Sequence, residues 1–245
     1  MNDRDDIGTR PCPNCYLCGA EGEYMYRDIE DGLFGVVGNW NLMKCPSAKC
    51  GLVWLDPMPM FEDIGKLYAN YYPHHSIKGE SFLYRLFQRA KNGYLKVKHP
   101  ALKSKIYDRF LGFLLYLHPS RRFDVDIVVT QLPAPGRRLL DIGCGAGKAL
   151  IRFRELGWEA EGIDIDREAV ETALAKGLNV QLGQVSEQKY LEKYFDVVIM
   201  DHVIEHVLEP VRLLEECYRV LKNGGYLVAY SPNVSCLGHK LYKSK

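Results

Sequence analysis

The feature that most constrains this chain is an apolar segment that runs directly into three glycines at alternate positions. Residues 139–147 read Leu-Leu-Asp-Ile-Gly-Cys-Gly-Ala-Gly. The apolar run predicts a buried strand, and the glycines predict a turn that accepts positive φ and lets a ligand touch bare backbone. A helix over residues 148–156 would point its unpaired N–H groups at that ligand. The stretch therefore predicts a loop that binds a nucleoside cofactor.

Two other glycine-rich loops fit this spacing less well. A dinucleotide-binding loop has the pattern Gly-x-Gly-x-x-Gly, and here the third glycine comes one residue early, which disfavours NAD without excluding it. A phosphate-binding P-loop needs glycine where Ile142 stands and a hydroxyl residue where Ala149 stands, so this interpretation fails at both positions.

The strand and loop resemble motif I of class I S-adenosylmethionine-dependent methyltransferases, in which an acidic residue ending the first strand precedes Gly-x-Gly-x-Gly. The resemblance implies that S-adenosylmethionine is the cofactor. It also implies that the motif supplies the following cofactor contacts: Asp141, Gly143, Cys144, Gly145 and Gly147.

A second predicted strand, residues 158–164, ends in a carboxylate about 20 residues beyond the glycine loop, where a nucleotide-binding fold places an acid against ribose hydroxyls. Asp164 is the candidate for this contact, and Ile165 is expected to join it in the cofactor site. Asp166 is the rival, although it is better placed to cap a helix over residues 167–176.

Further strands are predicted over residues 179–182, 195–200 and 224–230, with a helix over residues 210–221 before the last of them. Strands that alternate with helices predict a doubly wound, mostly parallel, Rossmann-like α/β sheet. The resemblance places Gln184 near adenine and Asp201 in the cofactor site. In such sheets ligands bind at the carboxyl ends of the strands. The family usually has two more strands, so the sheet is expected to be truncated after its fifth strand.

The segment after the fourth predicted strand contains His202, Glu205 and His206. On a helical turn these residues would share one face, and a histidine suits removal of a proton near neutral pH. We predict His202 as the base or substrate contact, with Glu205 and His206 as the other candidate catalytic residues or as braces for the loop. A metal site at the same three residues is an alternative, because some family members resemble it with Glu-x-x-Glu-His.

Four of the eight cysteines form two pairs, each followed by glycine: Cys15 with Cys18, and Cys45 with Cys50. Four thiolates suit a closed tetrahedral zinc site of structural rather than catalytic type. Cys12 is an alternative ligand. A zinc-knuckle module before a methyltransferase core resembles bacterial-type methyltransferases of unassigned substrate, some of which lie among sugar or polysaccharide biosynthesis enzymes.

The composition, with 47% hydrophobic and 26% charged residues, is that of a chain that can bury a core. We expect a zinc-knuckle module (1–58), a helical cover or linker (59–135) and the S-adenosylmethionine-binding core (136–245). Residues 85–109 carry eight Lys and Arg against one acid. This segment predicts an anionic acceptor, RNA or, with the apolar run 110–117, contact with a membrane surface through residues 85–117. The alternative is that the basic segment is a solvated helical face and the apolar run is core.

The expected function is methyl transfer from S-adenosylmethionine to a small-molecule or glycan-type acceptor at oxygen or carbon. Two alternatives remain: a catalytically idle scaffold with a structural zinc site, and an RNA methyltransferase. RNA is the less favoured partner, because the sequence lacks the Asn/Asp-Pro-Pro-aromatic signature of enzymes that methylate base amines. No signal peptide or transmembrane segment is evident, so a cytoplasmic location is expected.

Overall fold

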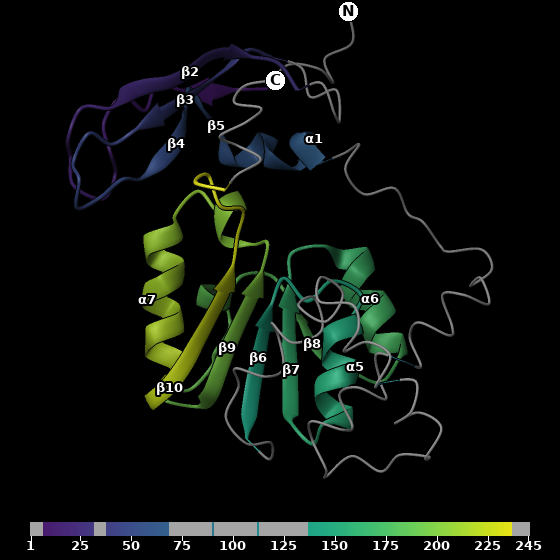
Figure 1. Ribbon diagram of the computed structural model, residues 1–245. Helices are drawn as coiled ribbons and strands as arrows, with labels where there is room; N and C mark the ends of the chain where they lie inside the picture. Colours follow the sequence, from purple (N-terminus) through teal and green to yellow (C-terminus); the bar gives the residue numbers. More distant parts are fainter. Residues whose placement is uncertain (1–6, 32–37, 69–89, 91–111, 113–136, 237–245) are drawn as a thin grey trace, which may run out of the picture. The chain divides into compact units, whose positions relative to one another are not determined.

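A computed structural model describes residues 7–31, 38–68, 90, 112 and 137–236 (Figure 1). The chain divides into two compact units. Residues 1–78 and the segment from Val234 onward form the first unit, and residues 79–233 form the second. The two cysteine pairs belong to the first unit, and the glycine loop belongs to the second.

The first unit is built from short antiparallel strands. A three-stranded sheet has the order β2 (Glu23–Ile29), β3 (Trp40–Lys44), β4 (Val53–Asp56), and a two-stranded sheet pairs β1 (Thr9–Arg10) with β5 (Met58–Pro59). A 3-10 turn, η1 (Phe61–Asp63), and a short helix, α1 (Ile64–Tyr68), follow.

The core of the first unit is small. Its buried cluster contains Cys15, Met43, Cys45 and Trp54. The Trp54 indole N–H donates to the carbonyl oxygen of Cys12 at 2.7 Å, which ties the start of the unit to β4. A core of this size buries little apolar surface, so the unit needs a further source of stability.

The second unit is a parallel five-stranded sheet in the order β10-β9-β6-β7-β8. Strands alternate with helices along the chain, as the sequence predicts. The elements are β6 (Arg138–Ile142), α5 (Lys148–Glu155), β7 (Glu159–Asp164), α6 (Arg167–Ala175), β8 (Asn179–Leu182), η2 (Val185–Glu187), β9 (Phe195–Asp201), η3 (Ile204–His206), α7 (Pro210–Val220) and β10 (Leu221–Tyr230).

Helices cover both faces of this sheet, which confirms the doubly wound α/β fold. Helices α5 and α6 lie on one face and α7 lies on the other (Figure 1). Successive residues of β6 point to opposite faces. Leu139 therefore packs in the cluster that includes Phe153 of α5, and Leu140 packs in the cluster that includes Cys217 of α7.

Strand β6 lies at the centre of the sheet. The chain proceeds from β6 to β7 and β8 on one side, and then returns to β9 and β10 on the other side. The order reverses between β6 and β9, and ligands of open α/β sheets bind beyond the carboxyl ends of the strands at such a point. The glycine loop follows β6, so it lies at this point.

Several predictions concern residues outside those described. They are most of the helical cover expected at 59–135, the basic and apolar segments within 85–117, and the end of the chain after residue 236, so these predictions stay untested. The module boundary at residue 58 also stays a prediction. Among the described helices, none combines the length and the apolar character needed to cross a membrane.

Candidate functional site

The three glycines of the loop all adopt positive φ, but they differ in the space available where a Cβ would lie. A Cβ on Gly143 would lie 2.5 Å from Val203 Cγ2, and a Cβ on Gly147 would lie 2.1 Å from Leu178 Cδ1. Gly145 has a φ of 52°, and a Cβ there would meet nothing within 4 Å. Gly143 and Gly147 therefore permit close packing of the loop against the protein, whereas Gly145 borders open space.

Asp164 at the end of β7 holds the glycine loop from the side. The N–H of Gly145 donates to Asp164 Oδ2 at 2.7 Å, and the N–H of Asp166 donates to Asp164 Oδ1 at 2.9 Å. Asp166 caps α6, because its Oδ1 accepts the N–H of Glu168 at 2.9 Å. The two neighbouring carboxylates therefore have different positions, and Asp164 is the one that reaches the loop.

Asp141 on β6 is a buried carboxylate between two other acids. Only 5% of its surface is exposed, and no donor among the described residues forms a hydrogen bond or ion pair with it. Burial, with the like charges of Asp201 and Asp164, raises the pKa of Asp141 to about 7. The ends of three adjacent strands, β7, β6 and β9, thus bring three carboxyl groups to one edge of the sheet.

The histidine segment differs in shape from the predicted helical turn. The turn η3 begins only at Ile204, and His202 precedes it in the left-handed region with a φ of 54°. The N–H of His202 donates to the carbonyl oxygen of Tyr230 at 2.9 Å, which extends the pairing of β9 with β10 and holds His202 out of the helix. A left-handed non-glycine residue is uncommon, and such residues cluster at functional sites.

The three side chains nevertheless gather around one carboxylate oxygen. His202 Nδ1 lies 3.0 Å from Glu205 Oε1, and His206 Nε2 lies 4.0 Å from the same oxygen. His202 Nε2 lies 3.9 Å from Asp201 Oδ1, and the His202 side chain is 64% exposed. The arrangement is a largely exposed histidine whose Nδ1 lies beside a carboxylate.

Three further predicted cofactor contacts differ in what they could offer a ligand. The Cys144 thiol is buried in the core beneath α5, so only the backbone of Cys144 is available to a ligand in the loop. Gln184 is the N-cap of η2, and its backbone N–H donates to Glu187 Oε2 at 2.8 Å. Ile165 is 73% exposed although it is large and apolar.

The sequence reasoning missed the residues that pack against the glycines. Val203 of the histidine segment fills the space beside Gly143, and Leu178 with Ala173 fills the space beside Gly147. These contacts join segments that are 26 to 60 residues apart. The strict requirement for glycine at residues 143 and 147 was the available signal, because a glycine forced by packing implies a close neighbour.

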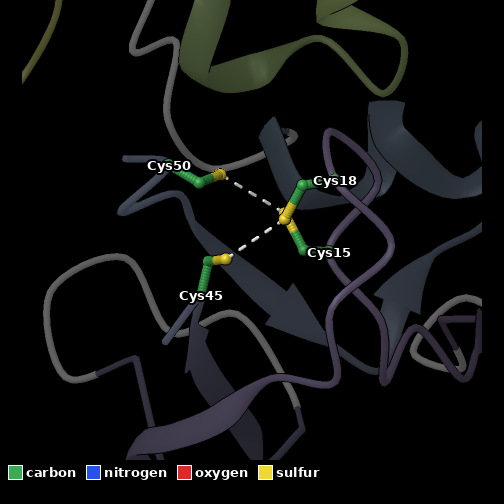
Figure 2. Close-up of side chains that lie close together, drawn as sticks. All are labelled: Cys15, Cys18, Cys45 and Cys50. Carbon is green, nitrogen blue, oxygen red and sulfur yellow. Dashed lines mark hydrogen bonds between the residues drawn. The ribbon is translucent and has the colours of Figure 1, made fainter. Parts of the chain in front are cut away.

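The predicted metal ligands of the first unit converge (Figure 2). The Sγ atoms of Cys15, Cys18, Cys45 and Cys50 all lie within 4.8 Å of one another, with Cys15–Cys50 at 3.6 Å and Cys18–Cys45 at 3.4 Å. A tetrahedral zinc ion with Zn–S bonds of about 2.3 Å needs S–S separations of about 3.8 Å. The four thiols are therefore spaced as ligands of one ion and are too far apart for disulfides.

The backbone around these cysteines also suits thiolate ligands. Gly19 and Gly51, one residue after each pair, have φ values of 74° and 63°. Burial raises the pKa of Cys15, but hydrogen bonds from the backbone of Leu17 and Cys18 and with the thiols of Cys50 and Cys18 together lower it to about 7. Burial raises the pKa of Cys45 to about 12. Among the described residues, these four cysteines are the one group of three or more potential ligands that could hold a metal ion, and neither Cys12 nor the histidine segment belongs to such a group.

The comparison with protein families concerns part of the second unit. Residues 140–229 match the family described as a methyltransferase domain. A ubiquinone biosynthesis O-methyltransferase of Pseudomonas entomophila is 30% identical over 135 residues, which are 52% of this chain and 58% of that protein. A protein of the same description from Xanthomonas oryzae pv. oryzae is 35% identical over 118 residues, which are 45% and 49% of the two chains.

Among solved structures, a SAM-dependent methyltransferase from Archaeoglobus fulgidus is 29% identical, with a TM-score of 0.41 over 56% of this chain and 63% of that chain. The chain spans 58% of the Pseudomonas relative's length and about half of the Xanthomonas relative's.

Proposed function

Because residues 140–229 form a class I S-adenosylmethionine-dependent methyltransferase domain, we propose that this chain transfers a methyl group from S-adenosylmethionine to an oxygen or carbon atom of a small-molecule or glycan-type acceptor. The observation that carries the proposal is the carboxyl edge of the sheet. At this edge lie Asp141, which is buried on β6, and Asp164, the candidate ribose contact at the end of β7. Gly145, which borders open space, lies in the loop that follows β6.

The residues at this edge fit a cationic nucleoside. S-adenosylmethionine carries a positively charged sulfonium and an ammonium group, and Asp141 is a buried carboxylate that lacks a donor among the described residues. A cation beside it would compensate the burial of the ionised carboxylate. Gly145 leaves room for the ligand, since a Cβ there would have no neighbour within 4 Å.

Asp164 and Ile165 would hold the nucleoside part. Each Asp164 oxygen accepts one backbone N–H and retains a second lone pair, so the carboxylate can still accept two ribose hydroxyl groups. Ile165 exposes an apolar side chain next to that acid, a surface on which the adenine ring can pack. Gln184 remains a candidate for the adenine edge, because its amide can donate and accept.

His202 is our candidate for the base that removes the acceptor proton. If Nδ1–H donates to Glu205 at 3.0 Å, the lone pair stays on Nε2, which would then accept the proton that an acceptor hydroxyl loses when it is methylated. The bound cofactor supplies a methyl group that is already activated on its sulfonium sulfur. The protein therefore needs only to align the acceptor and receive its proton. In this scheme Glu205 orients His202, and His206 lies at the other side of Glu205.

The nature of the acceptor is supported by the relatives. The matched relatives are described as ubiquinone biosynthesis O-methyltransferases, so an acceptor hydroxyl on a small molecule agrees best with a proton-removing histidine.

In the same proposal, one zinc ion is held by Cys15, Cys18, Cys45 and Cys50. This ion is structural because four protein ligands leave no position for substrate.

The test is calorimetric binding of S-adenosylmethionine by the wild-type chain and two variants, Asp164→Asn and Asp166→Asn. Loss of a hydrogen-bonded charge typically costs about 1.5–3 kcal/mol, so Asp164→Asn should weaken binding about tenfold or more. Asp166→Asn is the matched control, because asparagine caps a helix as well as aspartate does.

Binding by the wild type and Asp166→Asn, with weaker binding by Asp164→Asn, supports the proposal. A folded wild-type chain that does not bind S-adenosylmethionine contradicts it.

A further inference from the structure

Asp141 is a buried carboxyl group, and its position in the loop motif does not explain why it is buried. It lies on the central strand, nearly fully buried, and no donor among the described residues satisfies its carboxylate. The other two acids at this edge differ from it. Asp164 accepts two backbone N–H groups, and the Asp201 side chain is 59% exposed. Asp141 is therefore the group at this edge that is least able to remain charged in an empty site.

The groups around Asp141 favour the same conclusion. Asp164 acts on it from β7 and Asp201 acts on it from β9, and both carry negative charge. Cys144 of the glycine loop is also close, and burial with Asp141 and Asp164 raises its pKa to about 12, so it is neutral at physiological pH. His202 contacts Asp201 rather than Asp141. Burial and like charge thus both oppose ionisation of Asp141.

We propose that Asp141 selects a positively charged ligand: it holds a proton while the site is empty and releases that proton when the cationic methionine part of the cofactor binds. This inference rests on the proposed function and deepens it. One cation enters, one carboxyl O–H bond breaks, and one proton passes to solvent, so the net charge of the site is unchanged by binding.

The first experiment measures proton release during calorimetric binding of S-adenosylmethionine at pH 6.5. At this pH the ammonium group of the ligand is almost fully protonated, so it takes up little additional proton. The titration is repeated in two buffers that differ widely in ionisation enthalpy, because the difference in heat gives the number of protons released. With the pKa of about 7 for Asp141, we expect release of about 0.8 proton per bound ligand.

Two variants separate Asp141 from other sources of protons. Asp141→Asn should abolish the release, and Glu171→Gln, which removes an exposed carboxylate of α6, should leave it unchanged. Wild-type affinity should also rise about fivefold from pH 6 to pH 7, since less work is needed to ionise Asp141 at the higher pH.

A second measurement applies if Asp141→Asn binds too weakly for calorimetry. Carbon-13 NMR of the aspartate carboxyl groups should show one group in the ligand-free wild type that titrates near neutral pH and is missing in Asp141→Asn. In the presence of S-adenosylmethionine that carboxyl should stay ionised from pH 6 to pH 8.

The outcomes for the two proposals are distinct. Binding of S-adenosylmethionine without buffer-dependent heat, or with the same proton release in Asp141→Asn, overturns this inference and leaves the proposed function intact. Absence of binding by folded wild-type protein overturns the proposed function itself.

Discussion

Asp141→Asn should stabilise the ligand-free protein at alkaline pH. The carboxyl group has a pKa of about 7 in the folded chain and about 3.9 in an unfolded one. Because the pKa of this carboxyl group is higher in the folded chain, the group favours folding fully only when the pH is below its pKa in the unfolded chain. This contribution is lost as the pH rises toward 7, where the buried carboxyl ionises. Asparagine has nearly the same shape and carries no charge, so it avoids this loss.

The size of the effect follows from the difference between the two pKa values. Each unit is worth about 1.4 kcal/mol, so the penalty at pH 8 approaches about 4 kcal/mol. At pH 5 it is about 1.5 kcal/mol, because the folded carboxyl is then protonated. The advantage of Asp141→Asn should therefore grow by about 2–3 kcal/mol between pH 5 and pH 8.

Hydrogen exchange of peptides from β6 and β9 is a suitable assay, because it follows unfolding of the second unit by itself. Urea unfolding of wild type, Asp141→Asn and the control Glu171→Gln at pH 5, 6.5 and 8 provides the stability differences. Saturating S-adenosylmethionine should then stabilise wild type by about 2.7 kcal/mol at a concentration 100 times its Kd, and should stabilise Asp141→Asn much less. A stability difference between Asp141→Asn and wild type that does not change with pH would refute the reasoning.

Three other predictions concern different parts of the chain. Gly145→Ala should weaken cofactor binding strongly, whereas the control Gly177→Ala should not. Both residues have positive φ and no neighbour within 4 Å of a Cβ, so both variants should lose about 1–2 kcal/mol of stability. Calorimetry measures binding and thermal unfolding measures stability, and equal binding by the two variants would argue against a ligand at Gly145. Cys45→Ser should lose one zinc ion per chain by elemental analysis while Cys12→Ser retains it, and an unchanged metal content in Cys45→Ser would exclude the four-cysteine site. His202→Gln should lower kcat by about 10²–10⁴-fold with little change in cofactor affinity; an unaltered kcat would remove His202 from the proposed chemistry.

The strands β6 to β9 could be predicted almost to the residue because a glycine or an acid marks the end of each. The predicted strand 179–182 coincides with β8, and the acid that ends β7 was placed correctly. The start of β10 was harder to predict from the sequence. Leu221 pairs with Phe195 before an irregularity that precedes Tyr226, so the strand begins earlier than the glycines at 224 and 225 suggest.

The shape of the site was harder to predict than its residues. The spacing of His202 and Glu205 indicated that they would meet, and they do. The left-handed turn at His202 depends on the carbonyl oxygen of Tyr230, which lies on another strand. Likewise, the bond from Gly145 to Asp164 forms only when β6 and β7 are side by side. Local sequence patterns contain no information on such contacts between distant segments.

The strand order has a consequence for the way this protein folds. Strand β6 can pair early with β7, since Arg138 and Glu159 are near in the chain, but its other edge must wait for β9, where Leu139 meets Val197. Closing so long a loop is entropically costly, and sheets with distant pairings fold slowly. Val203 reaches Gly143, and Asp201 approaches Asp141, only after this closure. A cofactor that needs all of these groups can bind only a finished sheet, so its binding would act late in folding, by slowing unfolding rather than by speeding assembly.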